Sequence, residues 1–64
     1  MERLSGAEIQ VAALIAEGLS NREIGQRLAT GEAMVAHRLS QILRKLGLRN
    51  RIQLAVWAVK QGLY

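Results

Sequence analysis

The chain has 64 residues, of which 50% are hydrophobic and 22% charged, and its formal net charge at pH 7 is +4. This length allows one small domain, residues 1–64, and the apolar content is too high for a disordered tail. Without cysteine, the chain has neither a disulfide framework nor a thiolate metal site. No apolar run approaches the roughly 20 residues of a membrane span, so we expect a soluble, cytoplasmic protein without membrane contact.

The charges are distributed unevenly along the chain. Residues 1–32 hold three arginines and all five acids, a net charge of −2, whereas residues 33–64 hold six cations and no acid, a net charge of +6. Such asymmetry indicates that the second half faces a polyanion, although a solvated helical surface is the simpler alternative. With no proline and only two aromatic residues, the composition favours an all-α fold.

The first predicted helix covers residues 6–17. Ser5 and Glu8 have the S-x-x-E spacing of a capping box, in which each side chain accepts a hydrogen bond from the other residue's backbone N–H. Gly18 suits a left-handed helix stop. The residues spaced to form the buried face are Val11, Leu14 and Ile15.

The second predicted helix covers residues 21–29, after a second capping box formed by Ser20 and Glu23. Leu19 before the box and Ile24 after it suit a hydrophobic staple, and Ile24 and Leu28 are spaced as a buried pair. Only residues 29–31, Ala-Thr-Gly, separate this helix from the next one. A short glycine-containing turn before a basic helix is typical of the helix-turn-helix motif.

The third predicted helix covers residues 32–46 and ends at Gly47. Four of its apolar residues fall on one narrow stripe, and mostly polar residues occupy the opposite face. The apolar stripe consists of Val35, Leu39, Ile42 and Leu46. The opposite face consists of Ala33, His37, Ser40, Gln41 and Arg44.

The fourth predicted helix, residues 51–61, is apolar nearly all round. A surface helix needs only one apolar face, so the second one has to be covered by the core or by a partner. One face consists of Ile52, Val56, Val59 and Leu63. The other face consists of Leu54, Trp57 and Ala58.

Two segments carry a resemblance to a known family. The stretch LSGAEIQVAALIAEGLSNREIGQRL and the later block ILRKLGLRNR resemble the LuxR-type (GerE-like) helix-turn-helix domain of bacterial transcription regulators, over residues 4–63. The resemblance implies a four-helix bundle in which the helix at residues 32–46 enters the major groove and the last helix forms a homodimer interface. We expect that interface to consist of Leu54, Trp57, Ala58 and Gln61.

The chain departs from the family pattern where the third helix begins. The family's usual I-S-x-x-T-V-K is T-G-E-A-M-V-A at residues 30–36, which removes a serine cap, a threonine and a lysine. The usual L-T-P-R-E opening is L-S-G-A-E at residues 4–8, and the family's histidine position holds Arg38, with His37 one place earlier. These losses affect DNA affinity and specificity more than the fold, because glycine replaces the cap at a cost of only a few tenths of a kcal/mol.

We expect His37, Ser40 and Gln41 to contact base edges, glutamine being suited to adenine. Met34 is expected to pack against the bundle rather than to contact a thymine methyl group. Each polar candidate has a structural alternative, such as a solvated helix face or a favourable contact with the helix dipole. The cations expected at DNA, mainly on its phosphates, are Arg44, Lys45, Arg38, Arg22, Arg49 and Arg51.

No nucleophile–base pair, carboxylate dyad or glycine-rich phosphate loop points to an enzyme, and a single histidine offers no metal site. We therefore expect no cofactor and no small-molecule ligand. The favoured function is a sequence-specific, homodimeric DNA-binding transcription regulator, with double-stranded DNA as partner and RNA polymerase as a further candidate. The alternatives are a degenerate helix-turn-helix that binds a protein and a sigma-factor-like promoter-reading domain.

Overall fold

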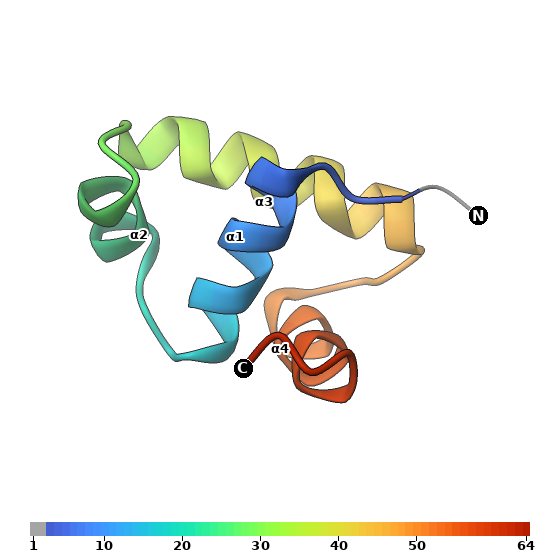
Figure 1. Ribbon diagram of the computed structural model, residues 1–64. Coiled ribbons are helices and arrows are strands. Elements are labelled where there is room, and N and C mark those ends of the chain that lie inside the picture. The colour runs from blue at the N-terminus through green and yellow to red at the C-terminus, as the bar shows by residue number, and fades with distance from the viewer. Residues whose placement is uncertain (1–2) are drawn as a thin grey trace.

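The computed structural model describes residues 3–64, and these form four helices: α1 (Gly6–Ala16), α2 (Asn21–Arg27), α3 (Glu32–Leu46) and α4 (Arg51–Lys60). Each helix begins and ends within two residues of its predicted bounds, and the described residues contain no strand, so the all-α prediction is confirmed. Figure 1 shows α1 in the middle of the molecule, with α3 on one side and α4 on the other. No helix within residues 3–64 has both the length and the apolar character that a membrane crossing requires.

Side-chain caps define where three of the helices begin. The hydroxyl of Ser5 accepts a hydrogen bond from the backbone N–H of Glu8 at 3.2 Å, and the Glu8 carboxylate accepts one from the backbone N–H of Ser5 at 2.7 Å. Ser20 and Glu23 repeat this arrangement before α2, at 3.1 and 2.8 Å, so both predicted capping boxes are confirmed. Asn50 caps α4 through the N–H of Gln53 at 2.9 Å. Each such cap stabilises a helix by about 1 kcal/mol.

The core is built around α1, which contacts each of the other helices. Its predicted stripe is buried, and the stripe of α3 points toward it, with Leu39 and Leu46 partly buried at its edge. The buried apolar residues of α1 are Val11, Ala12, Leu14 and Ile15. The other helices add Ile24, Val35, Ile42, Leu54 and Ala58.

The turn between α2 and α3 places its strained residue at an alanine. Ala29 has a φ of +56°, in the left-handed region, whereas Gly31 has a φ of −79° and serves as the N-cap of α3. The backbone N–H of Thr30 donates to the carbonyl of Gly25 at 2.8 Å. A Cβ atom on Gly25 would lie 2.8 Å from the carbonyl oxygen of Thr30, so α2 and the turn approach each other closely at this point.

A partly buried ion pair joins the beginning of α1 to the last turn of α3. The Nζ atom of Lys45 lies 2.9 Å from Oε1 of Glu8, and the Glu8 side chain is almost fully buried. Hydrogen bonds from the backbone N–H of Ser5 and from Lys45 lower the pKa of Glu8, against the opposing effect of burial. The folded state therefore favours the charged carboxylate.

Replacing Ala29 with glycine should stabilise the domain. A non-glycine residue in the left-handed region costs about 1–2 kcal/mol, of which the greater freedom of glycine in the unfolded chain offsets about 0.4–1 kcal/mol. We expect Ala29→Gly to raise the free energy of unfolding by about 0.5–1 kcal/mol in urea titrations followed by circular dichroism. The matched control Ala36→Gly, at an exposed position inside α3, should lower it by about 1 kcal/mol. A loss of stability in both variants would contradict the assignment of strain to Ala29.

The Glu8–Lys45 pair predicts an acid-sensitive stability. Because the pKa of Glu8 is lower in the folded state, its contribution is present above the ordinary value of 4.5 and is lost as the pH falls below it, through the folded-state pKa. We expect Glu8→Gln to be about 1–3 kcal/mol less stable at pH 7 and to lose less stability on acidification than the unaltered chain. The pKa of Glu23 is also lowered. Because Glu23 is present in both proteins, both keep the loss of stability on acidification that comes from this residue.

The control is Glu17→Gln, at the exposed end of α1, which should stay within about 0.5 kcal/mol of the unaltered chain at pH 7. Parallel stability-against-pH curves for Glu8→Gln and the unaltered chain would show that the pair does not stabilise the fold.

Candidate nucleic-acid interface

The outer face of α3 brings four of the predicted DNA-contacting side chains together. Val35 and Ile42 are fully buried in the core, where α3 contacts both α1 and α2, and this anchors the inner face of the helix. Side chains three and four positions apart share a face of a helix, so the polar residues between the buried ones point outward together. The exposed residues of this outer face are His37, Ser40, Gln41 and Arg44.

Three further cations lie around this outer face without joining it. Arg38 is half-buried on the flank of α3, and Arg22 is exposed in the first turn of α2, the helix that packs against α3. Arg49 is exposed just beyond the left-handed Gly47 that ends α3, and its backbone N–H donates to Oε1 of Gln53 at 2.7 Å. Arg38 thus belongs to α3 itself, and Arg22 and Arg49 belong to segments next to it.

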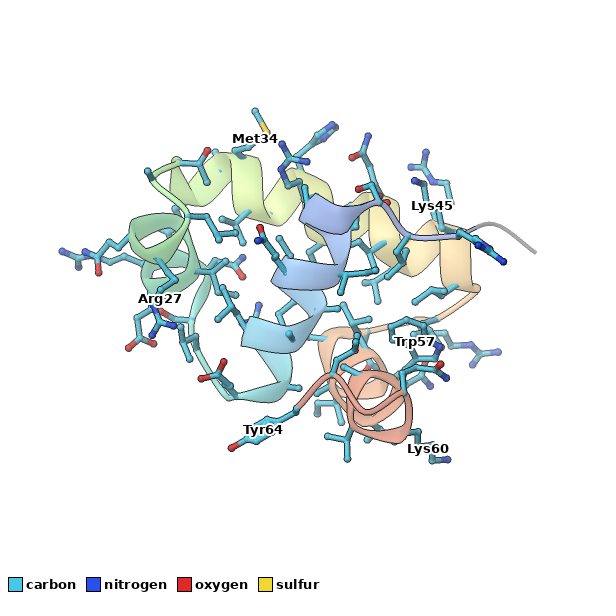
Figure 2. The ribbon with its side chains drawn as sticks, in the orientation of Figure 1. Arg27, Met34, Lys45, Trp57, Lys60 and Tyr64 are labelled. Carbon is cyan, nitrogen blue, oxygen red and sulfur yellow. The ribbon has the colours of Figure 1, made fainter. Side chains whose placement is uncertain are left out.

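Two of the predicted phosphate contacts instead have partners within the protein. Lys45, labelled in Figure 2, is 33% exposed and bonds the Glu8 carboxylate. Arg51 is half-buried, and its guanidinium donates to the side-chain oxygen of Asn21 and to the backbone carbonyl of Leu19. These contacts link α3 to the beginning of α1, and α4 to the beginning of α2 and to Leu19 before it, so both cations contribute to the fold.

The predicted interface on α4 is wrong at two of its four residues. Leu54 and Ala58 are each 0% exposed and complete the core beside α1, so no partner can contact them. Trp57 is half-buried and Gln61 is exposed, and both line a groove of about 460 Å³ together with residues near the beginning of the chain. A core this small needs the Leu54 face of α4 to close it.

The opposite face of α4 is left apolar and exposed. Ile52 is 75% exposed, Val56 49% and Val59 55%. Periodicity alone could not rank the two faces, because both are apolar. The one sequence signal for the inward face is Ala58, since a small residue lets two helices approach closely, and α1 has the equally buried Ala12.

Met34 also lies elsewhere than predicted. It was expected to pack against the bundle, but its side chain is 46% exposed, and Figure 2 shows it extending from α3 away from the other helices. Met34 points about 100° away from Val35 around the helix, and Val35 occupies the core position of that turn. The apolar pattern did contain a signal for this exposure, because Met34 lies outside the stripe formed by Val35, Leu39, Ile42 and Leu46.

The outer face of α3 carries hydrogen-bonding and cationic groups. Within residues 3–64, no three histidine, cysteine or acidic side chains gather closely enough to hold a metal ion. A helix with such a face fits the width of the DNA major groove, and its serine, glutamine, histidine and arginine side chains can donate to bases or phosphates.

Several known proteins are similar to this chain in sequence. The profile described as bacterial regulatory proteins, luxR family, matches residues 2–58. The transcriptional regulatory protein LnrK of Bacillus subtilis (strain 168) is 38% identical over 60 residues, which cover 94% of this chain and 27% of LnrK. LiaR of the same organism is 39% identical over 62 residues, covering 97% of this chain and 29% of LiaR.

The nitrate/nitrite response regulator protein NarL of Escherichia coli (strain K12) is 31% identical over 64 residues, covering 100% of this chain and 30% of NarL. The chain therefore spans less than a third of the length of these relatives. The family profile runs from before α1 to within α4 and so includes the helix-turn-helix formed by α2 and α3. On this match, the chain belongs to the luxR family of bacterial regulatory proteins.

Proposed function

We propose that this domain binds double-stranded DNA in a sequence-specific manner, as a homodimer, and thereby regulates transcription. The observation that carries the proposal is the exposed polar face of α3, on a helix whose opposite face is anchored in the core. The relatives LnrK and LiaR, which are named as transcriptional regulatory proteins, support it. In this account the domain works in the bacterial cytoplasm, and RNA polymerase is the machinery that its binding affects.

The side chains around α3 divide into two groups by the DNA atoms that they can reach. Ser40, Gln41 and His37 have short or planar polar ends suited to hydrogen bonds with base edges. Phosphate contacts position the protein and supply most of the affinity. The cations proposed for them are Arg44, Arg38, Arg22 and Arg49.

The second copy of the chain is proposed to cover the exposed apolar face of α4. A two-fold interface uses the same patch on both subunits, and the Ile52, Val56 and Val59 side chains can pack against their own counterparts. This face replaces the one predicted from the sequence, because Leu54 and Ala58 are in the core. A two-fold dimer places its half-sites about 10 bp apart, centre to centre, or at a multiple of that spacing.

Phosphate contacts predict a steep dependence of DNA binding on salt. The logarithm of the association constant should fall linearly with the logarithm of salt concentration, with a slope of about 0.9 per contact, in anisotropy titrations of a duplex of about 20 bp. Arg44→Ala should reduce this slope by about one contact and weaken binding similarly for different sequences. Lys60→Ala, on α4 and far from α3 in Figure 2, should leave the slope unchanged. Binding that ignores salt would contradict the proposed function.

Acidic substitutions on the two faces of α4 should have opposite consequences. Val56→Asp places a charge at an exposed position, so we expect a folded monomer in sedimentation experiments, with the helical circular dichroism of the unaltered chain. Leu54→Asp buries an unpaired charge in the core and should unfold the chain. A dimer that persists in Val56→Asp would show that the second copy does not bind this face.

A further inference from the structure

Met34 is an exposed apolar side chain on an otherwise polar and cationic surface. It precedes His37 by three positions and Gln41 by seven, so these residues lie on the same side of α3. The exposed residues beside it in the first turns, Ala33 and Ala36, are too short to reach as far from the helix axis. Met34 is thus the longest apolar group that α3 presents outward near its beginning.

The core does not account for this side chain, because Met34 is 46% exposed and Val35 fills the buried position next to it. Figure 2 shows it on the side of α3 turned away from α1 and α4. Methionine has a flexible, polarizable chain that adapts to irregular apolar surfaces. Only a partner outside the helix bundle can therefore cover the exposed part of the Met34 side chain.

We infer that Met34 contacts the 5-methyl group of a thymine in the major groove; this inference rests on the proposed function. Thymine is the only one of the four bases that presents an apolar group there. The charges around α3 bring it to the phosphates, and base contacts by His37 and Gln41 leave Met34 facing the adjoining base step. The domain then selects half-sites with a thymine beside the base pair that these two side chains contact.

The expected change in DNA affinity follows from the size of the thymine methyl group. Withdrawing one methyl-sized group from water contributes about 0.8 kcal/mol, which corresponds to about a four-fold change in affinity. Replacing thymine by deoxyuridine removes this methyl group and leaves every hydrogen-bonding atom of the base in place. A four-fold loss on that replacement is therefore specific to an apolar contact.

The experiment begins with duplexes that the unaltered chain selects from a randomised pool of about 20-bp sites. Each thymine of the preferred duplex is replaced in turn by deoxyuridine, and affinities are measured by anisotropy. We expect one or two thymines per half-site whose replacement weakens binding about four-fold. In Met34→Gln, which keeps the chain length but not the apolar end, the loss at that position should disappear, whereas Met34→Leu should retain it.

The matched control is Ile9→Gln, which alters an apolar side chain of similar exposure, 39%, on α1. It should retain the full effect of deoxyuridine. If no duplex is selected and binding ignores salt, both the proposed function and this inference are overturned. If a duplex is selected but no deoxyuridine weakens binding, or if the loss persists in Met34→Gln, the inference alone is overturned.

Discussion

The position of α1 between α3 and α4 determines which surfaces of this domain face outward. Its apolar side chains, Val11, Leu14 and Ile15 among them, pack against the other helices, and each helix must turn one apolar face toward it. On α3, the face with Val35 and Ile42 is therefore buried in the core, and the polar residues lie on the exposed face. A chain of 64 residues buries only about 60% of its unfolded surface, so no other core is available. The DNA-facing surface that we propose is thus a consequence of how the core closes.

Polar contacts between helices add to the stability of this small core. They involve cations that composition alone would assign to DNA binding. Lys45 bonds Glu8 and ties α3 to α1, while Arg51 bonds Asn21 and the carbonyl of Leu19. The net charge of the second half of the chain therefore overstates the charge that is free to meet phosphate. Arg44, on the outer face of α3, remains the cation best placed for that contact.

Comparison of α3 and α4 shows what the sequence could and could not predict. On α3, apolar and polar residues separate onto opposite faces, so the pattern alone identified both the buried stripe and the outer face. On α4, both faces are apolar, and only the tertiary packing shows that Leu54 and Ala58 are inside and Val56 is outside.

Single residues without a periodic context were harder to place. The left-handed conformation of Ala29 runs against the preference of alanine, and it is set by the geometry of the turn between two anchored helices. The exposure of Met34 depends on which residue of the first turn of α3 reaches the core, and that residue is Val35. The local sequence of the turn does not encode the conformation of Ala29. For Met34 the sequence did contain a signal, because this residue lies outside the apolar stripe of α3.

Binding of DNA by the outer face of α3 can be observed residue by residue in an amide-shift titration of the isotope-labelled chain with duplex DNA. If α3 binds DNA through this face, the backbone amide signals of His37, Ser40, Gln41 and Arg44 shift with added duplex, and those of buried residues such as Leu14 remain nearly in place. Shifts confined to the exposed face of α4 around Val56, with α3 unaffected, would contradict DNA binding by α3.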